Sequence, residues 1–141
     1  MPGTRELVER FYDLFNRGEL DAARECFSDE VENVDPSASL RGWEAFRQYI
    51  EVFKMASPDS RLNAKTWIDG GDVVAVEGSF TGTFTGPLAS PQGDVPPTGK
   101  SFDLPFVEVN EARGGRITSH RVYYDQTSFL TALGIMPPQG A

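Results

Sequence analysis

The chain of 141 residues is poor in the side chains that cross-link small proteins or hold metals. It has a single cysteine, Cys26, and a single histidine, His120. One cysteine excludes an internal disulfide framework and is typical of a reducing compartment. Because no second histidine or cysteine stands at ligand spacing, a metal site would need carboxylates alone, and we expect none. No serine or cysteine triad can be assembled convincingly.

Basic residues are also scarce, since 13 Lys and Arg stand against 21 Asp and Glu, a net charge of −8. Binding to a phosphate backbone needs clustered Lys and Arg, so we expect no nucleic acid partner. The chain lacks a basic amphipathic face, an apolar signal core, and any apolar run near the roughly 20 residues that span a bilayer. We therefore expect an acidic, soluble, cytoplasmic protein with no membrane partner.

Apolar material, by contrast, is plentiful. Hydrophobic residues make up 39% of the chain, and the aromatic residues include 10 Phe. The length suits one domain with one sizeable core, and no internal repeat is evident. We expect a single domain over residues 1–141, with apolar side chains enough for a core and for the lining of a cavity.

The first half of the chain has the apolar spacing of helices. Helices are expected between the N-cap Thr4 and the stop Gly18, from Leu20 to about Phe27, and from Trp43 to the residues before Pro58. A brief extended segment, residues 31–36, is ended by a proline, which biases Asp35 away from helical angles.

The second half switches to an alternation of period two, which predicts strands. The expected strands are residues 62–68, 73–85, 101–110 and 116–125, and a last turn of helix is expected at 128–133. The loop 86–99 contains four prolines, so it should be ordered by stiffness rather than by pairing. Helices followed by an antiparallel meander predict the α+β class, a bent sheet with helices on one face.

Three stretches carry a resemblance to a known family. They are residues 27–46 with Asp35-Pro36 and Arg41-Gly42-Trp43, residues 82–100 with Pro97-Thr98-Gly99-Lys100, and residues 115–134 with Tyr124-Asp125. In this order they resemble the SnoaL-like polyketide cyclases of the NTF2-like superfamily. The resemblance implies a cone with three N-terminal helices on the concave face of a curved mixed or antiparallel sheet, around an apolar pocket. This fold hosts many activities, so it is a poor guide to chemistry.

Asp125 closes the last expected strand, where SnoaL-like cyclases place an acid/base aspartate. At the end of an apolar cavity, partial desolvation would raise its pKa and suit it to carbon-acid chemistry. In those cyclases the residue assists an aldol closure without metal or organic cofactor, so the resemblance implies no cofactor. The alternative is that Asp125 caps the terminal helical turn near Thr127 and Ser128.

Asp35 is the second candidate, because its Val-Asp-Pro context resembles the strand that carries the base of ketosteroid isomerase. The oxyanion hole of that isomerase does not carry over. Its tyrosine position is Phe11 here, with Tyr12 beside it, and its protonated aspartate falls near Pro105, with Asp103 two residues upstream. The alternative is an Asp that holds a turn before proline.

Several further residues are candidates for the pocket. Tyr123 shares a face with Asp125 and could donate a hydrogen bond to a developing enolate, as could Tyr12 or Tyr49. By alternation His120 faces the opposite side from Asp125, and a lone strand histidine is more often a surface or interface residue than a catalytic one. Other candidates for the lining, for which plain core is the alternative, are Trp43, Phe46, Phe80 and Phe84.

Two functions stay open. The first is a pocket enzyme doing cofactor-independent acid/base chemistry of the cyclase or isomerase type on an apolar oxygenated substrate, such as a polyketide or a steroid-like ketone. The second is a non-catalytic ligand-binding or interaction module, favoured by Phe84 at a position where many SnoaL-like relatives carry histidine. Both expect a homodimer paired through the outer faces of the sheets, which light scattering would test.

Overall fold

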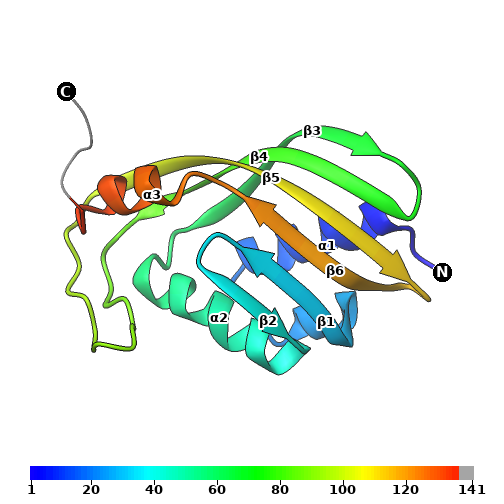
Figure 1. The fold of residues 1–141 in the computed structure, drawn as a ribbon, viewed down its shortest axis with the longest axis horizontal. Helices are drawn as coiled ribbons and strands as arrows, with labels where there is room; N and C mark the ends of the chain where they lie inside the picture. Colours follow the sequence, from blue (N-terminus) through cyan, green and yellow to red (C-terminus); the bar gives the residue numbers. More distant parts are fainter. Residues whose placement is uncertain (137–141) are drawn as a thin grey trace.

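A single curved sheet of six strands organises the protein in a computed structural model, which describes residues 1–136 (Figure 1). The strands lie in the order β2-β1-β6-β5-β4-β3, and only β1 and β6 run parallel. Their bounds are β1 Phe27–Asp35, β2 Ala38–Arg41, β3 Arg61–Asp69, β4 Val73–Thr83, β5 Ser101–Arg113 and β6 Arg116–Tyr123. The predicted α+β class and mixed sheet are confirmed.

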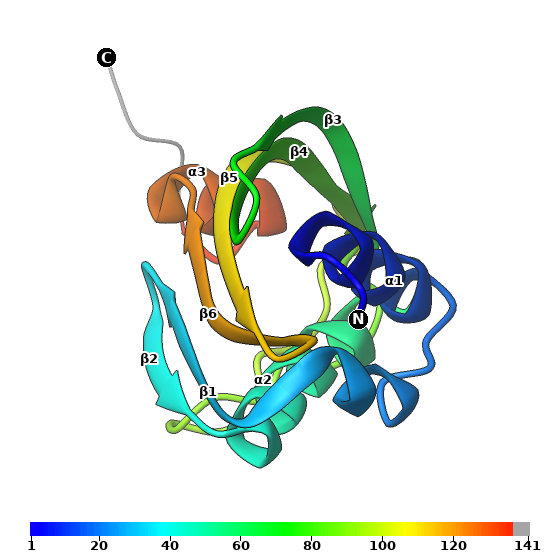
Figure 2. The same cartoon turned by 90° about the vertical axis from the view of Figure 1, so that its right-hand side faces the viewer.

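The helices are α1 (Thr4–Asn16), α2 (Trp43–Ala56) and α3 (Gln126–Leu133). Figure 2 shows the sheet curving around α1 and α2. The expected second helix is a five-residue 3-10 helix, η1 (Ala22–Cys26), so the N-terminal half holds two α-helices, and the third lies at the other end of the chain. Such a short segment closes few hydrogen bonds and stays a single tight turn.

The main core lies between α1 and the concave face of the sheet. Helix α1 buries Leu7, Phe11 and Leu14 at steps of four and three residues, which is the spacing of one helical face. At the start of β1, Phe27 stacks on Trp43 with ring centroids 5.4 Å apart. Trp43 is therefore a core residue that anchors the beginning of α2, and it does not line the cavity described below.

A β-bulge in β3 breaks the strict alternation that the sequence predicts. Ala64 pairs with Gly78 and Thr66 pairs with Glu77, so Lys65 is the extra residue. Before the bulge Leu62 packs against the core, as expected. Beyond it the inward and outward positions exchange: Trp67 packs on the core, and Ile68 is 61% exposed.

A second apolar cluster ties α3 to the far end of the sheet. Phe84, Phe102, Phe129 and Leu133 are buried together in it. The loop 86–99 packs on this cluster and is held by backbone hydrogen bonds in both directions between Leu88 and Val95, 3.0 and 2.7 Å long. Pairing therefore helps to order the loop, contrary to the expectation of stiffness alone. Phe84 is fully buried here and does not line the cavity.

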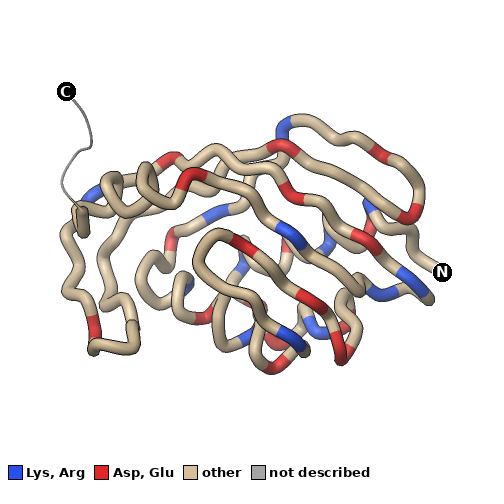
Figure 3. The backbone as a smooth tube through the Cα atoms, in the orientation of Figure 1, with Lys and Arg blue, Asp and Glu red and all other residues tan. Residues whose placement is uncertain are grey.

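Charged residues are dispersed over the surface. In Figure 3 basic positions are interspersed with acidic ones along the strands and helices. Arg121 pairs with Glu111 at 2.6 Å. Between residues 1 and 136, no helix combines the length and apolar character that crossing a membrane requires. Val107 and Tyr123 pair on the outer face and are partly exposed, and the homodimer stays a prediction.

Candidate functional site

A cavity of about 110 Å³ lies between the concave face of the sheet and the three helices. Its wall is mostly apolar, and nine of the twenty lining residues are phenylalanine or tyrosine. Its outer end is formed by the end of β1 and the start of β2, and Val34 of β1 is 43% exposed. The phenylalanines that line it are Phe11, Phe15, Phe46, Phe53, Phe80, Phe106 and Phe129.

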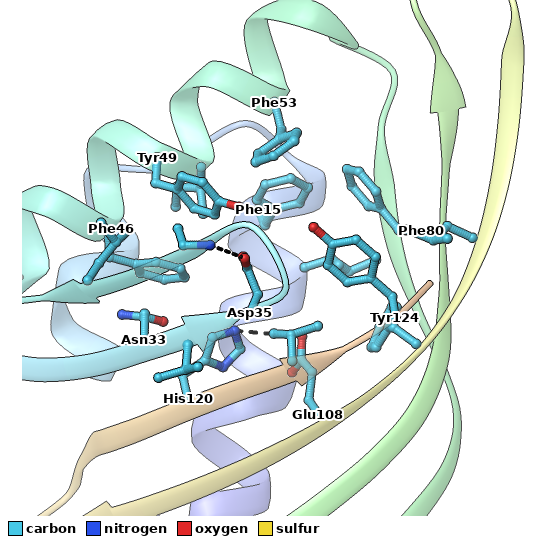
Figure 4. Close-up of a pocket in the computed structure, with 18 of the residues that line it drawn as sticks. Phe15, Asn33, Asp35, Phe46, Tyr49, Phe53, Phe80, Glu108, His120 and Tyr124 are labelled. Atoms are coloured by element: carbon cyan, nitrogen blue, oxygen red, sulfur yellow. Dashed lines mark hydrogen bonds and ion pairs between the residues drawn. The ribbon is translucent and has the colours of Figure 1, made fainter. Parts of the chain in front are cut away.

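Two titratable side chains lie at the buried end of this cavity, Glu108 on β5 and His120 on β6 (Figure 4). They are 2% and 4% exposed, and His120 Nε2 lies 3.8 Å from Glu108 Oε2. Glu108 follows the inward-facing residues Leu104 and Phe106 at the same period of two. The alternation along β5 thus places the carboxyl group of Glu108 in an apolar interior.

Asn110 orients both members of the pair. Its Oδ1 lies 2.6 Å from His120 Nδ1, and its Nδ2 donates to Glu108 Oε1 at 3.3 Å. Because an amide oxygen only accepts, Nδ1 carries the proton and Nε2 is left facing the carboxyl group. The two groups therefore face each other at the end of the cavity, and each of them is hydrogen-bonded to Asn110.

Asn33 on β1 lies beside this pair. Asn33 and His120 are register partners in the parallel ladder of β1 and β6, and Figure 4 shows the two side chains next to each other. Asn33 is 5% exposed, and neither its Nδ2 nor its Oδ1 has a hydrogen-bond partner within residues 1–136.

Hydroxyl groups gather toward the outer end of the cavity. Asp35 Oδ1 accepts hydrogen bonds from the backbone N–H of Ser37 and of Ala38, at 2.8 and 2.9 Å, so it holds the turn before β2. The Ser37 and Tyr49 hydroxyls are hydrogen-bonded to each other. Burial raises the pKa of Tyr49 and of Tyr124, so both stay protonated at neutral pH and can donate hydrogen bonds.

Comparisons with known proteins agree with this architecture. The model of the SnoaL-like domain matches residues 8–120. The chain belongs to the SnoaL-like family. No curated protein matches it.

Three solved structures of similar fold come from bacteria. A candidate SnoaL-like polyketide cyclase from Jannaschia sp. CCS1 has a TM-score of 0.82 and 24% identity, over 96% of this chain and 93% of that one. IdmH, a candidate polyketide cyclase from Streptomyces antibioticus, has a TM-score of 0.77 and 24% identity, over 93% of this chain and 98% of that one. AclR, a candidate hydroxylase from Streptomyces galilaeus, has a TM-score of 0.79 and 21% identity, over 97% of this chain and 84% of that one. At these identities the likeness shows the fold.

In this SnoaL-like domain Asp125 lies outside the cavity. It follows the end of β6, is exposed, and caps α3: its Oδ1 accepts from the Ser128 N–H at 3.2 Å and its Oδ2 from the Ser128 hydroxyl at 2.8 Å. These hydrogen bonds lower the pKa of Asp125. The expected rise in pKa by desolvation is therefore wrong, because the carboxylate stays in solvent at the head of a helix.

Asp125→Ala is expected to lower the melting temperature slightly, whereas Asp125→Asn should not, because Asn caps a helix as well as Asp does. The folded-state pKa of Asp125 is lowered, so its stabilising effect is present at neutral pH and is lost as the pH falls through that value. Thermal melts at neutral and acid pH should show the deficit of Asp125→Ala shrinking in acid. A deficit that stays constant would contradict the cap.

The other residues predicted for the site divide into two groups. His120, Phe46, Phe80 and Asp35 line the cavity. The remaining candidates do not line it. Tyr123 is 55% exposed, Asp103 is exposed on the outer side of β5, and Tyr12 is in the core, together with Trp43 and Phe84 as described above.

Sequence reasoning missed Glu108, Asn33 and Tyr124. A signal for Glu108 was present, since it continues the inward-facing alternation of Phe102, Leu104 and Phe106. For Asn33 no comparable signal existed, because its position next to His120 depends on the pairing of β1 with β6, two strands far apart in the sequence.

Proposed function

We propose that this pocket protein is a cofactor-independent enzyme that moves a proton on an apolar, oxygen-bearing small molecule, in the manner of a cyclase or an isomerase. One observation carries the proposal: Glu108 and His120 meet at the buried end of an otherwise largely apolar cavity. Buried carboxyl and imidazole groups lower the stability of a fold unless they are paired. A mostly apolar cavity with a few convergent polar groups is the usual form of a small-molecule site.

The chemistry that fits this arrangement is enolisation of a ketone. Glu108 accepts a proton from the carbon next to the carbonyl, the C–H electrons form a carbon–carbon double bond, and the carbonyl electrons move onto oxygen. His120, held through Nδ1 by Asn110, stays beside the carboxyl group. The Tyr124 hydroxyl, which stays protonated at neutral pH, is a neutral hydrogen-bond donor for an oxygen of the substrate.

The fate of the enolate separates the two reaction types. In an isomerase the proton returns from Glu108 to a different carbon. In a cyclase the enolate carbon attacks a second carbonyl carbon, and the proton goes to the new alkoxide oxygen. Either sequence balances without an oxidant or reductant, so no cofactor is required. Within residues 1–136 no three His, Cys, Asp or Glu side chains gather as metal ligands would.

The experiment follows exchange of α-protons in D₂O by NMR for three ketones of increasing size: cyclohexane-1,2-dione, 2-tetralone and androst-4-ene-3,17-dione. We expect the protein to accelerate exchange over buffer for at least one of them. Binding without acceleration for any of the three would overturn the proposal in favour of a non-catalytic ligand-binding module.

A further inference from the structure

We propose that the cavity takes a single-ring molecule in which a carbonyl stands next to a hydroxyl, and that Asn33 recognises this pair of oxygens. The inference rests on the proposed function, because it names the substrate class for the same site. It also goes beyond it, since acid/base chemistry at Glu108 and His120 sets neither the size nor the polar pattern of the ligand.

The first support is the unpaired amide of Asn33. Buried polar atoms in folded proteins nearly always have a hydrogen-bond partner, and each one left without a partner is destabilising. Asn33 leaves both its donor and its acceptor unpaired at 5% exposure. The other buried side-chain atoms without a partner, within residues 1–136, belong to Tyr12, Ser60 and Thr131, and none of these residues lines the cavity.

The second support is the chemistry of an amide. Its NH₂ group donates and its oxygen accepts, so a ligand that satisfies both presents one acceptor and one donor side by side. A carbonyl next to a hydroxyl does this, and so does the enol of a 1,2-diketone. A carboxylate does not, because it only accepts, and its charge would also meet the carboxyl group of Glu108 at the same end of the cavity.

The third support is position. Asn33 and His120 are register partners on neighbouring strands, which lie about 4.8 Å apart in a sheet. A carbonyl oxygen held by Asn33 Nδ2 therefore lies beside the imidazole, and Glu108 follows on β5, with its Oε2 3.8 Å from His120 Nε2 (Figure 4). In the proposal the adjacent carbon lies between Asn33 and Glu108, where proton transfer needs it.

The fourth support is size. The cavity of about 110 Å³ is smaller than an engineered cavity of about 150 Å³ that binds benzene, so it limits the ligand to a single ring. Aromatic rings border the cavity on several sides, among them those of Phe46 from α2, Phe80 from β4 and Phe129 from α3. A four-ring ketone would need these side chains to move apart, and they belong to the packed clusters of the fold.

The test measures binding of cyclohexane-1,2-dione, which exists largely as its enol, by NMR titration. Asn33→Leu should weaken binding by about tenfold or more, because the ligand oxygens lose both partners. Its melting temperature should be unchanged or higher, because the variant no longer buries an unpaired amide. Asn33→Ala, which removes the amide without adding bulk, should weaken binding equally. Cyclohexanone, which lacks the hydroxyl, should bind more weakly to the wild type than the dione does.

Asn63→Leu is the matched control. The Asn63 amide on β3 is hydrogen-bonded to the Ser79 carbonyl and the Thr81 hydroxyl at 3.2 and 3.1 Å, so its loss should lower stability and leave binding unchanged. The inference is overturned if the Asn33 variants bind the dione as the wild type does. It is also overturned if androst-4-ene-3,17-dione binds at least as tightly as the dione.

The two proposals fail in different ways. Dione binding that depends on Asn33, with no acceleration of α-proton exchange for any ketone, would overturn the proposed enzyme and support the ligand class. Accelerated exchange of the steroid, with no binding of the dione, would overturn the ligand class and support the enzyme.

Discussion

Replacing Glu108 by glutamine is expected to slow enzyme-catalysed α-proton exchange by about 10²–10⁴-fold, the usual contribution of a general acid or base. Glutamine keeps the size of the side chain. Its amide oxygen can still accept from Asn110 Nδ2, as Glu108 Oε1 does at 3.3 Å, and its NH₂ group can donate to His120 Nε2. The fold should therefore persist, while the group that takes the proton is gone.

Asp125→Asn makes the same chemical change at an exposed carboxylate and is the control for Glu108→Gln. Because Asp125 only caps α3, this variant should exchange protons at the wild-type rate. The comparison also decides between Glu108 and Asp125 as the catalytic carboxylate. Full activity in Glu108→Gln together with loss of activity in Asp125→Asn would show that Asp125 is the catalytic carboxylate. It would contradict the catalytic role proposed for Glu108 and His120.

The sequence predicted the sheet well where one strand followed another in a meander. The alternation along β6 put His120, Val122 and Tyr124 on one face, and all three line the cavity. The alternation no longer applies at Asp125, the residue after Tyr124. The strand ends at Tyr123, and Asp125 already belongs to the start of α3, where a carboxylate finds the free N–H of Ser128.

Features that depend on distant pairing were not predictable in the same way. The short strand β2 forms because Asp35 turns the chain and its partner strand β1 is already fixed against β6. The exchange of faces in β3 depends on a bulge at Lys65, which local alternation does not reveal. The cavity brings β1, β5 and β6 together, so its polar end, with Asn33, Glu108 and His120, emerges only when the sheet is assembled.

Phe27→Ala is expected to have the largest effect on stability. Phe27 is 1% exposed, and its ring meets those of Phe11 and Phe46 at centroid distances of 4.9 and 5.2 Å. Deleting a buried phenylalanine ring typically costs about 3–5 kcal/mol. For a chain of this length that lowers the melting temperature by roughly 10–17 °C, which differential scanning calorimetry would measure.

Phe27→Ala should also slow enzyme-catalysed α-proton exchange. The Phe27 ring lies edge-on to His120, with centroids 6.2 Å apart, and together with Phe11 and Phe46 it confines the imidazole from the side of the helices. Once that ring is gone, His120 gains freedom to turn away from Glu108. Exchange should then slow even at temperatures where the variant is fully folded. Phe84→Ala is the control, because Phe84 is equally buried but belongs to the cluster under α3, not to the cluster of Phe11, Phe27 and Phe46 that confines His120. If both variants slow exchange by the same factor, general loosening of the fold, rather than the position of His120, controls the rate.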